Sequence, residues 1–353
     1  MPTRTPDPPR PAVGSRVTIA DIARDLGISK AAVSYALTGR PGVGHETRQR
    51  VLAAAEQMGW YPSSSARALT GAETGVVGLV LSRPPELLTF ETFFVHLLAG
   101  LEQVLAERGS SLLLRVIGDH PQEEVATYRR WWGERRIDGV LVLDERYRDP
   151  RLDQIREAMI PAVLCGGPLR DWTMPALWTD HGADADLAVA HLHELGHRRV
   201  AHVSGPTEFV HERARRRGVR RAATKRGMAV GTVEGAYTGP DAARHTARLL
   251  AADPAERPTA IIYGSDVMAA SGLAAAVEAG LRVPADVSLL SWDDSQLATL
   301  IRPSVSALRR DNLGYGVLAG HTLLDLVEGR NRGLVQLPAS DLVVRDSTAP
   351  VPH

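Results

Sequence analysis

Residues 17–39 of the chain read VTIADIARDLGISKAAVSYALTG, and this stretch decides how the N-terminal part folds. Apolar residues recur in it at the spacing of one helix face: Ile19, Ile22, Ala23 and Leu26, then Val33, Ala36 and Leu37. Thr18 and Ser29 are residue types that cap the N-terminus of a helix. Gly27, between the two apolar groups, is the residue type that most readily adopts the left-handed conformation that ends a helix. The stretch therefore predicts two short helices, the second over 30–38, joined by a tight turn.

A third amphipathic segment follows after a glycine-rich loop. It spans about 45–58, Gly59 ends it, and one face carries Val51, Leu52, Ala55 and Met58. Three helices over residues 17–61 predict a helix-turn-helix head, although any three-helix mini-bundle would have the same pattern. The DNA-binding interpretation is favoured because the outward side chains of the second helix are polar or small enough to enter a major groove: Lys30, Ala31, Ser34, Tyr35 and Thr38.

The distribution of charge supports the same interpretation. The 353-residue chain has 41 Lys and Arg and 41 Asp and Glu, so its net charge is zero. Nine of these cations but only five of the anions lie in residues 1–71, which gives this segment a charge of +4 and the remainder −4. A basic head on an acidic body is typical of a polyanion-binding module joined to a second function.

Composition excludes several classes of protein. Cys165 is the single cysteine, which excludes an internal disulfide and a structural zinc site of the CxxC type. No apolar run approaches the ~18 residues that a membrane-spanning helix needs. Residues 1–16 are rich in Pro and Arg and lack an apolar signal region, so we expect a disordered tail and a cytoplasmic protein without a membrane partner.

Common catalytic motifs are also missing from the sequence, and a histidine cluster is its candidate for a metal site. There is no GxxxxGK[ST] phosphate loop and no GxSxG nucleophile elbow. Four histidines cluster at His191, His193, His197 and His202. Residues 193–197 read HELGH, which has the HExxH spacing of a zinc site, but this segment leads directly into the apolar run 199–204 and fits a structural role better. We therefore expect no catalytic site, no metal and no other cofactor, and we expect Cys165 to be a buried small residue.

From Gly75 onwards, β-branched apolar runs alternate with helical patterns. The runs indicate buried strands at 75–81, 111–117, 139–143, 161–165, 199–204, 259–264 and 287–292. Helical patterns occupy 93–108, 183–195, 242–252 and 267–279. Repeated βα units predict an α/β body of parallel sheets over 75–348, followed by a tail over 349–353. We expect two lobes with a seam near 166–179, and a ligand beyond the carboxyl ends of the strands.

With head, linker and body in this order, the chain resembles the lactose-repressor/galactose-repressor family of bacterial transcription regulators over about Val17–Thr348. The resemblance is carried by the head, by VLAAAEQMGWYPSSSARALTG (51–71), and in the body by ELGHRRVAHVSGP (194–206), SDVMAASGLAAAVEAGLRVPADVSLLSWDDS (265–295) and RPSVSALRRD (302–311). It implies a hinge helix within 62–74 and a two-lobed body like that of a periplasmic sugar-binding protein. It also implies that the chain crosses back between the lobes near 303–308 and 334–338.

For the head, the resemblance implies that the second helix lies in the major groove of near-palindromic, double-stranded operator DNA. Lys30, Ala31 and Tyr35 occupy the positions that meet base edges; Lys30 can donate to guanine, and Ala31 can touch a thymine methyl group. Ser29 and Ser34 are suited to phosphate contacts, although Ser29 fits the role of a simple helix cap equally well.

The segment SSSARALT (63–70) matches the hinge helix of the family, which folds as a pair on operator DNA. The resemblance implies that Leu69 wedges into the minor groove, supported by Ala66 and Arg67. Ser63 stands where Asn is often found, and a flexible linker is the alternative interpretation. A paired hinge implies a homodimer.

For the body, the resemblance implies a cleft that binds a sugar-like effector. Arg213 is the arginine expected to point into this cleft, and Asp266 and Asp293 match carboxylates near it. Asp266 fits the role of a cap for the following helix equally well, and Ser82 and Arg83 are candidate rim contacts. Four aromatic residues are candidates to stack on a sugar ring, although each also fits a core position: Phe90, Phe93, Tyr237 and Trp292.

These observations predict a sequence-specific DNA-binding regulator, expected to be a repressor, whose operator affinity changes when a small molecule binds. Two alternatives belong to other classes. A solute-binding protein for uptake is disfavoured by the basic head and the missing signal region. A doubly wound enzyme is disfavoured because the sequence has no nucleophile or phosphate motif and its HELGH segment fits a structural role.

Overall fold

The computed structural model describes residues 17–61, 73–84, 88, 91–118, 120–167 and 172–351. The chain divides into two compact units, residues 1–72 and residues 73–353. Among the helices of the described residues, none has the length and apolar character needed to span a bilayer.

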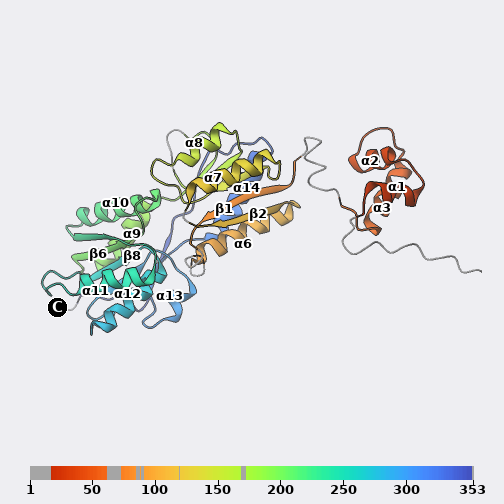
Figure 1. Ribbon diagram of the computed structural model, residues 1–353. Coiled ribbons are helices and arrows are strands. Elements are labelled where there is room, and N and C mark those ends of the chain that lie inside the picture. Colours follow the sequence, from red (N-terminus) through yellow and green to blue (C-terminus); the bar gives the residue numbers. More distant parts are fainter. Residues whose placement is uncertain are drawn as a thin grey trace, which may run out of the picture. The chain divides into compact units, whose positions relative to one another are not determined.

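The described residues of the N-terminal unit form three helices (Figure 1): α1 (Ile19–Leu26), α2 (Lys30–Thr38) and α3 (His45–Gln57). Each contributes apolar side chains to one small core, in which Ile22, Val33 and Val51 are fully buried. The three predicted helices are therefore confirmed.

The turn between α1 and α2 forms as the sequence predicts. The Thr18 hydroxyl donates a hydrogen bond of 2.6 Å to the Asp21 carboxylate at the start of α1. Gly27 ends this helix at a φ of 65°, a conformation that side chains rarely adopt. Ser29 caps α2, because its hydroxyl oxygen accepts a hydrogen bond of 3.1 Å from the amide of Ala32.

The second unit, the body, contains two six-stranded sheets. The first has the order β11-β5-β4-β3-β1-β2 and the second the order β12-β10-β9-β8-β6-β7. Neighbouring strands are parallel except for the antiparallel pair of β10 and β12. The strands are β1 (Val76–Ser82), β2 (Ser111–Ile117), β3 (Gly139–Val142), β4 (Ala162–Cys165), β5 (Ala176–Trp178), β6 (Arg199–Ser204), β7 (Ala229–Glu234), β8 (Ala260–Tyr263), β9 (Ser288–Ser291), β10 (Ser306–Arg309), β11 (Leu334–Gln336) and β12 (Asp341–Val343).

Helices cover both faces of each sheet. They are α6 (Thr92–Glu107), α7 (Pro121–Gly133), α8 (Pro150–Glu157), α9 (His181–Glu194), α10 (Val210–Lys225), α11 (Gly239–Leu250), α12 (Asp266–Glu278), α13 (Gln296–Leu300) and α14 (Asn312–Val327). On the first sheet, α6 and α14 pack on one face and α7 and α8 on the other, and we call this part lobe 1. On the second sheet, α9 and α10 oppose α11 and α12, and we call this part lobe 2. The predicted α/β body of parallel βα units is confirmed.

The chain passes between the lobes at three places (Figure 1). The first passage follows β5 and precedes α9, at the end of the predicted seam. The predicted second crossing, near 303–308, is misplaced, because Ser306–Arg309 forms β10 and pairs with β9 in lobe 2. The chain returns to lobe 1 only as α14 begins at Asn312, and it passes to lobe 2 again between β11 and β12.

Two glycines allow α6 and α14 to pack with their backbones in contact. A Cβ atom added to Gly316 of α14 would lie 2.1 Å from the carbonyl oxygen of Leu97 on α6. The contact is reciprocal, since a Cβ on Gly100 of α6 would lie 2.1 Å from the carbonyl oxygen of Leu313. Any side chain at either position would therefore force the helices apart.

Candidate functional site

The outward face of α2 is available for a partner. Ser29, Lys30 and Ala31 are exposed, Ser34 is half-buried and Tyr35 is 41% exposed. Buried Val33 and Ala36 fix the opposite face of α2 in the core of the head. The five residues expected at the DNA therefore share one accessible surface, and their contacts with bases and phosphates remain predictions.

Some of the predicted site residues lie outside the described residues. These are the hinge residues Ser63, Ala66, Arg67 and Leu69, together with the aromatic candidate Phe90. The predicted tail over 1–16 also lies outside them. The roles expected for these residues stay predictions.

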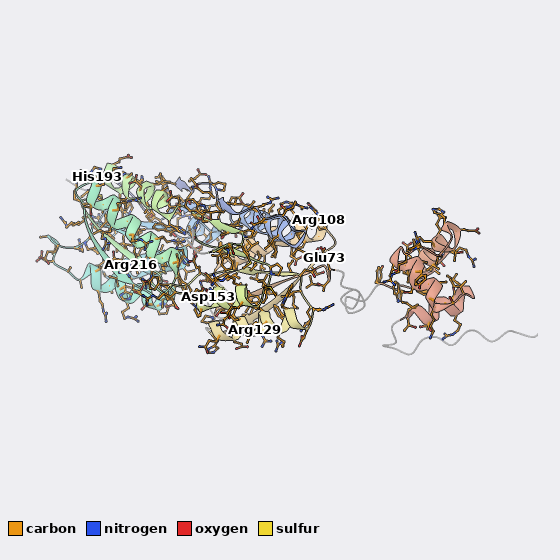
Figure 2. The ribbon with its side chains drawn as sticks, turned by 90° about the horizontal axis from the view of Figure 1, so that it is seen from above. Glu73, Arg108, Arg129, Asp153, His193 and Arg216 are labelled. Atoms are coloured by element: carbon orange, nitrogen blue, oxygen red, sulfur yellow. The ribbon has the colours of Figure 1, made fainter. Side chains whose placement is uncertain are left out.

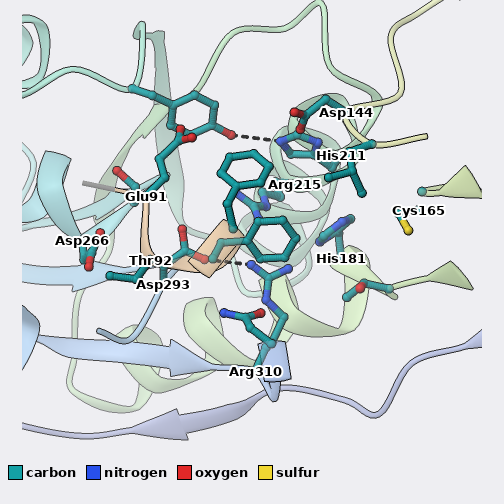
Figure 3. A pocket seen from close by; sticks show the side chains of 18 of the residues that line it. Glu91, Thr92, Asp144, Cys165, His181, His211, Arg215, Asp266, Asp293 and Arg310 are labelled. Carbon is teal, nitrogen blue, oxygen red and sulfur yellow. Dashed lines mark hydrogen bonds and ion pairs between the residues drawn. The ribbon is translucent and has the colours of Figure 1, made fainter. Parts of the chain in front are cut away.

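A cavity of about 960 Å³ lies where the carboxyl ends of the strands of both lobes meet (Figure 3). From lobe 1 it is lined by Arg83, which follows β1, and by Asp144, which follows β3. From lobe 2 it is lined by Asp266, which follows β8, and by Asp293, which follows β9. Polar side chains gather here because loops at this edge of a parallel sheet have no helix or strand covering them.

Arg83 organises the lobe 1 side of the cavity. Its guanidinium is buried, lies 3.0 Å from the Asp144 carboxylate and 3.4 Å from that of Glu91, and stacks 4.6 Å from the ring centre of Phe209 in lobe 2. Asp144 has a φ of 52°, a left-handed conformation that Asp adopts more readily than most side chains.

Glu212 organises the lobe 2 side. Its buried carboxylate accepts hydrogen bonds of 2.7 Å from Arg215, from the Tyr237 hydroxyl and from the amide of Gly205. His211 Nε2 lies 3.0 Å from the same Tyr237 oxygen. Burial holds the pKa of His211 well below its usual value, so this histidine is neutral. Because the Tyr237 hydroxyl donates its proton to Glu212, its oxygen accepts the hydrogen bond from His211 Nε2. Tyr237 is thereby fixed in orientation, although its φ of 61° is uncommon for an aromatic residue.

Two of the predicted carboxylates line the cavity side by side with cations and hydroxyls. Asp293 lies 2.8 Å from Nη2 of Arg310. Asp266 accepts hydrogen bonds from the Ser295 hydroxyl and from the amide of Val267, and burial raises its pKa to about 6. The α12 helix is capped by the preceding Ser265, so the alternative role of Asp266 as the cap is not what the structure shows.

The prediction for Arg213 is wrong in its placement. Arg213 is absent from the cavity lining; its Nε donates to the Thr207 carbonyl and its guanidinium lies 4.1 Å from the ring centre of Tyr147. Arg215, two residues further along α10, lines the cavity instead. Residues two apart on a helix point in nearly opposite directions, and the inward face of α10 is the one that carries Glu212 and Arg215.

Two other expected contacts lie behind the cavity wall. Ser82 is buried and its hydroxyl donates to the carbonyl of Gly118 at 3.2 Å. Trp292 is fully buried, 5.9 Å from the ring of His202 and 5.0 Å from the guanidinium of Arg215. Both residues are therefore corrected to structural positions, whereas Phe93 and Tyr237 do line the cavity.

Several lining residues escaped the sequence analysis. They are Glu91, Asp144, His181, His211, Arg215 and Arg310. Asp144 and Arg310 each follow a strand directly or by one residue, which is a signal that could have found them. Glu91, His181 and His211 lie at helix starts and Arg215 in the second turn of α10, where the orientation of each side chain depends on tertiary packing.

The histidine cluster has structural contacts. His197 lies 2.9 Å from the Thr259 hydroxyl and 3.1 Å from that of Ser288, and His191 lies 3.1 Å from the Thr348 hydroxyl. No group of three or more His, Cys, Asp or Glu among the described residues could hold a metal ion.

A pair of loops joins the lobes beside the cavity, and we call residues 145–147 and 208–210 together with Arg213 the clasp. Arg146 Nε lies 3.3 Å from the Glu208 carboxylate. The backbone amide of Tyr147 donates to the Glu208 carbonyl at 2.8 Å, and that of Val210 donates to the Glu145 carbonyl at 2.9 Å. The contact of Arg213 with the Tyr147 ring completes it, so Arg213 acts between lobes rather than in the cavity.

Replacing Glu91 with glutamine should stabilise the protein more at pH 7.5 than at pH 5. Burial raises the pKa of Glu91 to about 7 from a usual value of 4.5, although Arg83 opposes the shift. Between these two values the native state holds a proton that the unfolded chain has released, so this carboxyl lowers stability as pH rises. Glutamine does not ionise. The free energy of unfolding of Glu91→Gln minus that of wild type, measured in urea, should therefore be about 2 kcal/mol larger at pH 7.5 than at pH 5.

The exposed Glu123 supplies the control for this measurement. Its side chain pairs with Arg115 on the surface of lobe 1. Glu123→Gln should keep a constant difference from wild type at both pH values, since screened surface pairs contribute little. A constant difference for Glu91→Gln as well would contradict the assignment of a destabilising carboxyl to Glu91.

Two family profiles match the chain. Residues 18–63 match the profile described as "Bacterial regulatory proteins, lacI family", and residues 189–348 match that of a "Periplasmic binding protein-like domain". The two matches together extend over more than half of the sequence.

Individual proteins are similar over nearly the full length. The HTH-type transcriptional regulator MalR of Streptomyces coelicolor is 32% identical over 351 residues, covering 95% of this chain and 97% of that relative. A LacI family transcriptional regulator from Bifidobacterium animalis subsp. lactis has a solved structure with a TM-score of 0.73 and 33% identity, covering 80% of this chain and all of that one. The transcriptional regulator CelR in complex with cellobiose has a TM-score of 0.71 and 27% identity, covering 94% of this chain and 100% of that chain.

Proposed function

Because the chain belongs to the LacI family of bacterial regulatory proteins, it is a DNA-binding transcriptional regulator rather than an enzyme, and we propose which residues perform each part of that function. In this proposal, residues 17–61 bind near-palindromic operator DNA, 62–74 form the hinge, and 75–348 bind the effector. The protein acts in the cytoplasm, where its operator is.

The cavity carries the proposal for the effector. Carboxylates and arginines from both lobes converge on it, among them Arg83, Asp293 and Arg215, and the rings of Phe93 and Tyr237 give it aromatic faces. Polar groups of this kind beside aromatic rings suit a hydroxyl-rich ring such as a sugar. The cellobiose complex of the similar regulator CelR supports the same class of ligand.

A homodimer completes the proposal. Large apolar side chains remain exposed on elements of both lobes: Val95 on α6, Leu114 and Val116 on β2, Val277 on α12 and Leu300 on α13. Their burial against a second copy would remove apolar surface from water and place two heads on one operator. The near-palindromic symmetry expected of the operator follows from that two-fold arrangement.

Exchanging both Lys30 and Tyr35 for alanine should abolish sequence-specific DNA binding but leave non-specific binding in place. The two side chains lie on the exposed face of α2, and each base contact contributes about 1–3 kcal/mol of discrimination. The measurement is selection of binding sites from genomic DNA with the wild-type chain, followed by gel shift of the selected site at two salt concentrations. Gln57→Ala, an exposed change on α3, is the control and should bind as wild type does.

Failure of the wild-type chain to select any DNA sequence, with or without sugars, would refute the proposed function. Unchanged selectivity of the Lys30→Ala, Tyr35→Ala variant would refute only the assignment of α2 as the recognition helix. The two results are distinguishable because the first needs no variant.

Weakening the clasp should open the lobes in the absence of effector. The variant combines Glu208→Gln with Tyr147→Ala, which removes the ion pair to Arg146 and the ring beneath Arg213. Because two lobes joined by few contacts move about their crossings, loss of these contacts should shift the population to larger separations.

Spin-label distances between the lobes measure this opening. The single native cysteine is buried, so labels can be placed on exposed residues of α8 and α10 through Glu157→Cys and Thr224→Cys. Glu123→Gln, which breaks an ion pair within lobe 1, is the control. An unchanged distance distribution in the clasp variant would show that the clasp does not hold the lobes together.

A further inference from the structure

The α10 helix concentrates positive charge on an acidic body. Between Val210 and Lys225 it carries seven Lys and Arg residues and a single carboxylate, that of Glu212. The residues from 72 to 353 have a net charge of −4, so the basic character of α10 is local. Figure 2 shows side chains of lobe 2, with Arg216 labelled on this helix.

Three of the seven cations have partners within the protein. Arg215 pairs with buried Glu212 at 2.7 Å, Arg216 lies 3.3 Å from Glu234, and Arg213 belongs to the clasp. The other four are exposed, and no described residue forms an ion pair or hydrogen bond with their side chains: Arg217, Arg220, Arg221 and Lys225. Three of these four cations, Arg220, Arg221 and Lys225, lie outside the lining of the cavity described above.

The four unpaired cations line one groove of about 760 Å³, which we call the basic groove. The rest of its lining consists of Asp180, Gly182, Ala214, Gly218 and Thr224. Asp180 is the single carboxylate there, and its Oδ1 is already used by the amides of Gly182 and Ala183 at 3.0 Å each. The lining therefore has an excess of three positive charges.

The backbone of Gly182 lines the groove next to the guanidinium of Arg221. A Cβ added to Gly182, in the first turn of α9, would lie 2.9 Å from Nη2 of Arg221. Along α10, Arg217, Arg221 and Lys225 are spaced four residues apart, and like charges at this spacing repel one another. An anion in the groove would relieve that repulsion and accept the unused N–H donors.

The groove adjoins the effector cavity. Asp180, Gly182, Ala214 and Arg217 line both, so the two share a wall. We propose that the basic groove binds a phosphate group of a small molecule, and that an effector with its uncharged part in the cavity places its phosphate among Arg217, Arg221 and Lys225. The second half of this proposal rests on the proposed function, because it takes the cavity as the effector site.

Inorganic pyrophosphate is the probe that tests the groove without knowledge of the effector. The full chain is titrated at constant ionic strength, with chloride as the balancing anion, and the melting temperature is recorded. Wild type should gain several degrees at saturation, because a ligand of the native state stabilises it. The variant with Arg217→Ala, Arg221→Ala and Lys225→Ala should lose most of that gain.

A variant matched in charge controls for non-specific effects. Arg129→Ala, Arg130→Ala and Arg136→Ala remove three exposed arginines from lobe 1, where Figure 2 labels Arg129. This variant should keep the full pyrophosphate shift. Equal shifts in all three proteins, or no shift in wild type, would overturn the proposal.

Operator binding distinguishes the phosphate-site proposal from the proposed function and from a nucleic-acid-binding surface. A groove variant restricted to Arg221→Ala and Lys225→Ala leaves the cavity lining unchanged and should select and bind the same operator as wild type when no ligand is present. Failure of wild type to bind any operator would refute the proposed function alone. If the groove variant loses non-specific DNA affinity and the lobe 1 variant does not, the groove is a nucleic-acid surface, and the phosphate-ligand proposal is overturned.

Discussion

Gly316→Ala should destabilise the body by about 3 kcal/mol or more, an effect large for the addition of one methyl group. The added Cβ would lie 2.1 Å from the Leu97 carbonyl oxygen and 2.9 Å from the amide of Leu101, both on the α6 backbone. Backbone atoms within a helix have no rotamer to change, so the whole helix must shift. That shift separates buried Leu97 and Leu101 from the first sheet, whose core they fill.

Urea unfolding of the full chain, followed by circular dichroism, measures this cost. Gly133→Ala is the matched control, since Gly133 ends α7 and has no atom within 4 Å of an added Cβ. Alanine there should be neutral or slightly stabilising, because it restricts the unfolded chain. Equal unfolding midpoints for Gly316→Ala and Gly133→Ala would contradict the close packing of α6 and α14.

The position of α14 illustrates what sequence reasoning misses in the fold. Strands with continuous apolar runs were predicted well, and β2 and β6 have the predicted limits. The strands β5, β11 and β12 have three residues each, too few for a periodic signal, and β7 alternates with only partial burial. Gly316 and Gly320 lower the helix propensity of α14, and the approach of α6 explains why they are there.

Some residues of the candidate site could likewise be predicted from the sequence, and others could not. Arg83 could be predicted because it directly follows a strand, and parallel strands end at a common edge. Asp266 and Asp293, three and two residues after their strands, are implied by the family resemblance. The choice between Arg213 and Arg215 depends on which side of α10 faces the sheet. Buried Glu212 fixes that side, and an arginine three residues after it is the pattern that a reading of the sequence could have used. The clasp and the basic groove arise from contacts between segments far apart in the sequence.

Arg215→Ala should both destabilise the body and remove the response to effector. Arg215 and Glu212 are buried, 5% and 0% exposed, and their charges lie 2.7 Å apart. Alanine leaves the Glu212 carboxylate with the Tyr237 hydroxyl and the Gly205 amide but without a cation, which costs about 3–5 kcal/mol for a buried pair. It also removes an arginine that lines the cavity, so ligands recognised by its N–H groups lose those bonds.

Two measurements separate these consequences. A thermal-shift screen of the wild-type chain against sugars, sugar phosphates and nucleosides identifies a ligand, and the same ligand is then applied to each variant. Arg216→Ala, a half-buried change on the outer side of α10, should keep both the melting temperature and the ligand shift of wild type. The double variant Arg215→Met with Glu212→Gln should recover part of the lost stability, because no buried charge is left unpaired.

That double variant decides whether Arg215 acts on the ligand or only on the fold. It should unfold cooperatively and yet show little or no ligand shift, since methionine fills the space of the arginine but offers no N–H donors. A full ligand shift in the recovered double variant would mean that Arg215 serves the fold alone, and that the cavity recognises its effector through Arg83 and the carboxylates of Asp266 and Asp293.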